Sequence, residues 1–179
     1  MRFFRLLLKD LLSLFKDDKE ELHLESFSFP DEIPTIMKIA REYFDNGKLE
    51  YPVNPYALLF AIREAEKGRK GFEFGIIIAK NTDLETQCRY ACQTIVNNVK
   101  RFHQYLQEGE RSALSERSED ELCSRSVEGK PGFPLKCNDF ITFLGSRYAP
   151  VGADNDPHNL NAHWVRNVKF FYNIFTGGS

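Results

Sequence analysis

The sequence has few cysteines, no excess of basic charge and no long hydrophobic run, and each absence argues against a class of protein. Four cysteines occur among 179 residues, and none belongs to a CxxC pair of the kind common in zinc modules. We therefore expect reduced, partly buried thiols and no metal site. The formal net charge is −2 and no basic stripe is present, which disfavours nucleic acid as a partner.

The longest apolar stretch, residues 1–15, does not qualify as a membrane span or a cleavable signal. Lys9 and Asp10 interrupt it, no small-residue cleavage site follows, and it is too short to cross a bilayer. We predict that residues 1–25 form an amphipathic helix and a linker before a single domain over residues 26–179. This helix would dock on the domain or make a peripheral contact with a membrane or a partner.

The composition is that of a globular, mainly α domain. Hydrophobic residues make up 42% and charged residues 28% of the chain, which is long enough to bury a core. Apolar periodicity predicts helices over residues 33–44, from residue 55 to about 66, from a Thr82–Glu85 capping box to about 106, from residue 138 to about 144, and after Pro157. We predict a small β element within residues 71–80 and a loop over residues 107–130. The expected class is therefore mainly α, with a small β element.

The segment 57–75 is the most informative part of the sequence. Leu58, Ile62 and Glu66 are spaced i, i+4, i+8, so they share one face of a helix. Asn54 is expected to cap that helix and Gly68 to end it. Because the face is otherwise apolar, the Glu66 carboxyl should be partly desolvated, which raises a carboxyl pKa and suits a general acid. Helix geometry places Glu64 toward solvent instead.

The same segment resembles a known family. Glu66-Lys67-Gly68 stands where the lysozyme-like superfamily, and within it the lytic transglycosylases and phage muralytic domains, has Glu-Ser-Gly. Phe74-Gly75-Ile76-Ile77 stands at the family's Gly-Leu-Met-Gln. The resemblance covers residues 56–78 well and the rest by helical order. Lys67 replaces the usual serine, and no glutamine follows Gly75.

The resemblance implies a mainly α fold of the α+β lysozyme-like kind and a glycosidase of peptidoglycan. Glu66 would be a single acid/base that cleaves glycan strands and leaves a 1,6-anhydromuramyl end, with no metal or organic cofactor. Tyr148 matches a late-loop tyrosine close to the catalytic glutamate. Further substrate-binding candidates are Glu73, Phe74, Gly75, Asn161 and Trp164.

Three alternatives remain open from the sequence. Glu73, Asp154 or Asp156 could face Glu66 as a second carboxylate, which would favour a lysozyme-type hydrolase. Glu66 could also be an ordinary helix-end residue paired with Arg63 or Arg69. In that case the chain would be a non-catalytic glycan-binding module or a phage or prophage structural part. The sequence does not decide the localisation, although phage-type delivery would bring such an enzyme to the cell wall.

Overall fold

The computed structural model describes residues 27–113, 139–149 and 160–177, and these ranges are mainly helical. The α-helices are α2 (Ile33–Phe44), α3 (Pro55–Glu66), α4 (Leu84–Ala113), α6 (Phe140–Tyr148) and α7 (Trp164–Phe175). Short 3-10 helices are η2 (Pro30–Glu32), η3 (Ile77–Ala79) and η4 (Leu160–His163). The mainly α class predicted from the sequence is confirmed.

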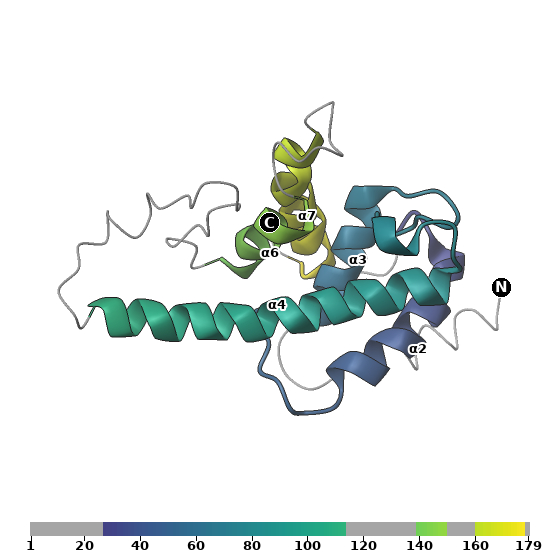
Figure 1. Cartoon of the computed structure of the whole chain (residues 1–179). Helices are drawn as coiled ribbons and strands as arrows, with labels where there is room; N and C mark the ends of the chain where they lie inside the picture. Colours follow the sequence, from purple (N-terminus) through teal and green to yellow (C-terminus); the bar gives the residue numbers. More distant parts are fainter. Residues whose placement is uncertain (1–26, 114–138, 150–159, 178–179) are drawn as a thin grey trace.

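Helix α4 is the longest helix of the described ranges, and α2, α3 and α6 pack against it (Figure 1). Its thirty residues correspond to about 45 Å of helix. Helix α2 packs on one side of it, and α3, α6 and α7 gather on the other side, with α3 lying along α7. The largest fully buried side chains come from all of these helices and from the segment after α3: Ile36, Ile39, Leu58, Leu59, Phe60, Ile62, Phe74, Ile95, Phe140, Phe143 and Phe175.

Helix α3 forms as its local sequence predicts at its N-terminal end. The Asn54 side chain accepts hydrogen bonds from the backbone N–H groups of Tyr56 and Ala57, at 3.0 and 3.1 Å. Pro55, which has no N–H to satisfy, occupies the first turn. All six residues 57–62 are fully buried, so α3 is the central helix of the core and carries Glu66 at its last position.

The C-terminal end of α3 differs from the prediction. Lys67, rather than Gly68, adopts the left-handed conformation, with φ of 47°. Gly68 is needed for a different reason. A Cβ there would lie 1.8 Å from the Phe72 carbonyl oxygen, because the following loop folds directly onto the helix end.

The boundaries of α4 also differ from the prediction. Thr82 does not form the expected capping box, because its hydroxyl donates to the Ala79 carbonyl at 2.6 Å. Asp83 caps the helix instead and accepts from the Thr86 N–H at 2.7 Å. The helix continues to Ala113, so the loop predicted from residue 107 is wrong over residues 107–113. The glutamates and the arginine of this stretch are good helix formers.

Helix α6 is longer than predicted. Asp139 caps it by accepting from the Ile141 N–H at 2.9 Å, and the helix continues through Gly145 to Tyr148, beyond the predicted end at about residue 144. A Cβ on Gly145 would lie 2.3 Å from a methyl group of Val165, so this glycine lets α6 pack closely against α7. Tertiary packing therefore outweighs the weak helix propensity of glycine.

The β element expected over residues 71–80 is not found. This segment consists of turns and η3, and no strand occurs in the described ranges. Gly71 and Gly75 have positive φ values, 81° and 67°, which break an extended strand. The β-branched Ile76, Ile77 and Ile78 favour a strand, but no neighbouring strand lies beside them in the described ranges. No strand forms here for that reason.

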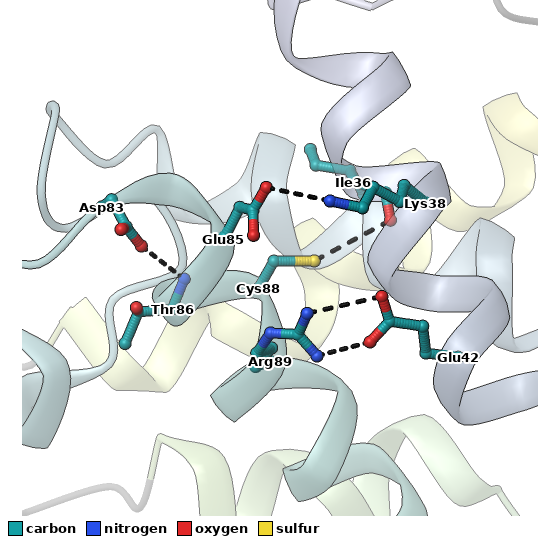
Figure 2. A network of polar contacts seen from close by, with 8 residues as sticks. All are labelled: Ile36, Lys38, Glu42, Asp83, Glu85, Thr86, Cys88 and Arg89. Atoms are coloured by element: carbon teal, nitrogen blue, oxygen red, sulfur yellow. Dashed lines mark hydrogen bonds and ion pairs between the residues drawn. The ribbon is translucent and has the colours of Figure 1, made fainter.

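Polar side chains join α2 to α4 along the exposed edge of their contact (Figure 2). Lys38 pairs with Glu85 at 3.3 Å, and Arg89 pairs with Glu42 at 2.5 Å. The buried Cys88 thiol lies between these pairs, 3.9 Å from the Ile36 carbonyl oxygen. Exposed pairs add little stability, so the apolar contact beneath them holds the two helices together.

Several sequence predictions fall outside the described residues. They concern the helix and linker over residues 1–25, most of the loop up to residue 130, Cys123, Cys137, Asp154 and Asp156. Within the described ranges, Cys88 and Cys92 are buried free thiols, as predicted. In the same ranges no helix combines the length and hydropathy required of a membrane span.

Candidate active site

Glu66 lies where the end of α3 meets the start of α7 and the loop that follows α3. Its carboxyl Oε1 accepts a hydrogen bond from the Trp164 indole N–H at 2.7 Å. Its other oxygen, Oε2, lies against Gly75, where a Cβ would come within 2.3 Å of it. In the described ranges Glu66 forms no ion pair with Arg63 or Arg69, because Arg63 pairs with Glu32 at 2.7 Å and no ion pair of Arg69 occurs there.

Burial raises the pKa of Glu66 to about 6, and the hydrogen bond from Trp164 partly offsets this rise. No carboxylate in the described ranges contributes to the shift. This is the arrangement expected of a carboxyl that holds a proton near neutral pH by desolvation. Such a group can act as an acid and then, once deprotonated, as a base.

Tyr148 and Trp164 form an aromatic pair beside Glu66. Their rings stack with centroids 5.0 Å apart. The Tyr148 hydroxyl donates to the Phe74 carbonyl oxygen at 2.6 Å, which ties α6 to the loop that carries Gly75. Burial, and then the charge of Glu66, raise the pKa of Tyr148 well above its ordinary value, so this phenol stays neutral.

The loop over residues 71–79 is held by one side chain of α4. The Gln87 amide nitrogen lies 3.3 Å from the Gly71 carbonyl oxygen, 3.4 Å from that of Ile76 and 2.5 Å from that of Ala79. Gln87 is fully buried. By holding both ends of this loop, it places Gly75 against Glu66.

The structure brings four of the sequence-predicted site residues together with Glu66, although not all through their side chains. Gly75, Tyr148 and Trp164 contact Glu66 or one another. The Phe74 ring is fully buried in the core, so only its carbonyl takes part. Trp164 is 6% exposed, and the edge that it turns to Glu66 is its indole N–H.

Glu73 and Asn161 lie outside this cluster. The Glu73 side chain is 4% exposed, and its Oε1 accepts from the Gly71 N–H at 2.8 Å within the same loop. It therefore supports the loop and makes no polar contact with Glu66 among the described residues. Asn161 lies in η4, half-exposed and three residues before Trp164, and none of the polar contacts of Glu66 involves it.

Glu64 contradicts the prediction that it faces solvent. It is 4% exposed, and its two carboxyl oxygens accept from the Ser28 N–H and hydroxyl at 2.5 and 2.7 Å. Glu64 and Glu66 do lie on different sides of α3, as helix geometry predicts. Glu64 is nevertheless buried, because the segment before η2 packs over its side of the helix. Two carboxylates of one helix are therefore buried in different environments.

Sequence reasoning missed Gln87 and Ser28. Gln87 had a usable signal, because it lies four residues before Ala91 on the apolar stripe of α4, where a polar residue needs a buried partner. Ser28 had no such signal, because its contact with Glu64 joins residues 36 positions apart.

Metal ligands do not gather in the described part of the chain, where no group of three or more His, Cys, Asp or Glu side chains could hold an ion. No protein-family model matches the sequence, and neither a curated protein nor a solved structure matches the chain.

Proposed function

We propose that this protein has a lysozyme-like fold and cleaves the glycan strands of peptidoglycan as a lytic transglycosylase, with Glu66 as its acid/base. The observation that carries the proposal is the Glu66 carboxyl, which is partly buried at the end of a core helix, where desolvation raises its pKa to about 6. Tyr148 and Trp164 pack beside it as a stacked aromatic pair, and the Trp164 N–H fixes the position of its carboxyl.

A single carboxylate is sufficient for the proposed reaction. Protonated Glu66 donates its proton to the glycosidic oxygen, and the leaving sugar departs with that oxygen as a hydroxyl. The substrate's N-acetyl oxygen stabilises the positive charge at the sugar carbon. Glu66, now a carboxylate, then removes the proton of the C6 hydroxyl, whose oxygen attacks that carbon and closes the 1,6-anhydro ring. Glu66 ends protonated, as it began.

The surroundings of Glu66 support both of its roles. The Trp164 N–H stabilises the carboxylate that forms after proton donation. Because Gly75 has no side chain, the loop backbone can lie directly against the other carboxyl oxygen. The proposed reaction needs no cofactor, and the glycan strand is the partner.

A second candidate is a non-catalytic glycan-binding or phage structural module. The observation that favours it is the close packing of both carboxyl oxygens, one on Trp164 and the other against Gly75. In this case Glu66 would serve only as a buried acceptor that joins α3 to α7.

The test is digestion of purified peptidoglycan by the full chain and by Glu66→Gln, with soluble products identified by mass spectrometry. We expect anhydromuramyl products from the wild type and a loss of about 10²–10⁴-fold in Glu66→Gln. Glu50→Gln, the same change at an exposed position, is the matched control. Reducing-end products would indicate a hydrolase, and Glu73→Gln would then be assayed. No products from folded wild-type protein would favour the non-catalytic module.

A further inference from the structure

An open cavity of about 680 Å³ lies at the C-terminal end of α3, next to Glu66 but outside its cluster. Its walls are residues 28–32, the last turn of α3 with Lys67 and Gly68, and Phe171 of α7. Glu66 does not line it. The acid/base chemistry proposed for Glu66 therefore does not use this cavity.

The cavity is within reach of a sugar held at Glu66. Lys67 and Gly68 directly follow Glu66 in the chain. Phe171 lies seven residues after Trp164 on α7, which is two helical turns along the same face, or about 10 Å. An extended peptide covers about 3.3–3.6 Å per residue, so three residues span that distance.

Part of the cavity wall is a set of satisfied polar contacts. Arg63 donates to both carboxyl oxygens of Glu32, at 2.7 and 2.8 Å, and its guanidinium lies 4.7 Å from the centroid of the Phe29 ring. Glu64 is held by Ser28 on the neighbouring side. The polar groups of Arg63 and Glu64 already have hydrogen-bond partners, so they form a rigid part of the cavity wall.

Two exposed charges at the cavity remain available to a ligand. The Lys67 ammonium and the Asp31 carboxylate both line it, and neither forms an ion pair within the described ranges. They have opposite signs. The half-buried Phe171 adds apolar surface to the cavity, whereas Phe29 is 7% exposed and lies beneath the Arg63 guanidinium. A complementary ligand would carry both an anionic and a cationic group on a short aliphatic frame.

We propose that this cavity binds the stem peptide of peptidoglycan, a short peptide that bears carboxylates and, in its uncrosslinked form, a free side-chain ammonium. This inference rests on the proposed function. Lys67 pairs with a peptide carboxylate, Asp31 pairs with the ammonium, and Phe171 packs against the aliphatic parts. A strong polyanion is a poor occupant because Asp31, Glu32 and Glu64 all line the cavity. The lysine that replaces the usual serine after the glutamate thereby gains a role in substrate recognition.

The first experiment measures binding without cleavage. The probe is a synthetic stem tetrapeptide with two free carboxylates and one lysine side chain, titrated calorimetrically at low salt into full-length Glu66→Gln. We expect saturable binding that weakens about tenfold or more in the Lys67→Glu and Asp31→Lys versions of this protein, and for a tetrapeptide with amidated carboxylates. Lys70→Glu is the matched control, because Lys70 is exposed and does not line the cavity.

Two binding results would overturn the inference. One is the absence of saturable binding to folded Glu66→Gln. The other is an equal loss in Lys67→Glu and Lys70→Glu, which would indicate only a general effect of net charge. Circular dichroism of each variant checks that it is folded.

The second experiment separates failure of this inference from failure of the proposed function. Wild type is given glycan strands with their stem peptides and strands from which an amidase has removed them. We expect a higher kcat/KM on the peptide-bearing strands, and Lys67→Glu should remove that preference. Equal cleavage of both strands by wild type would overturn the peptide site and leave the proposed function intact. Cleavage of neither strand would overturn the proposed function, whereas the binding experiment would still decide whether the cavity takes the peptide.

Discussion

The proton affinity of Glu66 is set by two effects that act in opposite directions. Burial raises its pKa and the Trp164 N–H lowers it, with a net value of about 6. About a tenth of the molecules would then hold the proton at pH 7. A change in either the burial of Glu66 or its hydrogen bond with Trp164 should therefore shift its pKa.

Replacing Trp164 with Phe should move the pH dependence of the reaction. The indole N–H is lost while an aromatic ring remains to stack on Tyr148, so the pKa of Glu66 should rise. The measurement is kcat/KM against pH on soluble glycan fragments, where the wild type should decline above pH 6 and Trp164→Phe only at higher pH. A decline at unchanged or lower pH would contradict the assignment of Glu66 as the acid.

Glu66→Gln should change the stability of the protein above about pH 5, and hardly at all at lower pH. The pKa of Glu66 is raised on folding from an ordinary value of 4.5 to about 6. The favourable contribution of its protonated form is therefore complete below pH 4.5 and is lost as the pH rises through 6. At pH 8 Glu66→Gln should be more stable than wild type by roughly 2 kcal/mol, and at pH 4 by little. Urea denaturation at the two pH values measures this, and an equal difference at both would contradict the pKa.

At the scale of single elements, the loop over residues 71–79 is shaped by what surrounds it. Gln87 binds its carbonyls, Tyr148 binds the Phe74 carbonyl, and Gly68 lets the loop backbone approach the end of α3. Gln87 lies on α4, Tyr148 on α6, and Gly68 just after the end of α3. The conformation of the loop beside Glu66 therefore depends on how α3, α4 and α6 are packed.

Gly68→Ala should disrupt this loop and the site with it. The new Cβ would lie 1.8 Å from the Phe72 carbonyl oxygen, so the loop must shift, at a cost of about 1–3 kcal/mol or more. We expect activity to fall more than tenfold under conditions where the variant is still folded. Gly47→Ala is the control: Gly47 has φ of 62° and open space around it, so that variant loses some stability and keeps its activity. Equal activities of the two variants would show that the loop tolerates the shift.

At the scale of the whole molecule, aromatic contacts join distant parts of the chain. The Phe27 ring lies 4.7 Å from that of Phe60 on α3 and 4.2 Å from that of Phe175 on α7. One cluster thus connects the first described residue, the central helix and the last helix. The pairing of α3 with α7, which places Trp164 at Glu66, depends on this cluster.

Phe175→Ala should therefore destabilise the entire fold. Removing a fully buried ring leaves a cavity and costs about 3–5 kcal/mol. Phe170→Ala is the matched control, since Phe170 is on the same helix but 60% exposed. Chemical denaturation should show a large loss for Phe175→Ala and a small one for Phe170→Ala. Similar losses for the two variants would contradict the described packing of α7.

The sequence by itself determined the helices and the position of the candidate acid, because the signals for both are local. Asn54, Pro55 and the apolar spacing up to Glu66 act within a few residues, and the structure has α3 where they predict it. The sequence also singled out Tyr148 and Trp164, but only through the family resemblance.

The tertiary structure decided what surrounds the acid. Trp164 donates to Glu66 across 98 positions, and Ser28 buries Glu64 across 36. The isoleucines after Gly75 favour a strand locally, but they meet no partner strand and the loop is bound by Gln87 instead. Periodicity and capping depend on neighbours in the chain, whereas burial and pKa depend on which helices pack together, and only the folded chain fixes that.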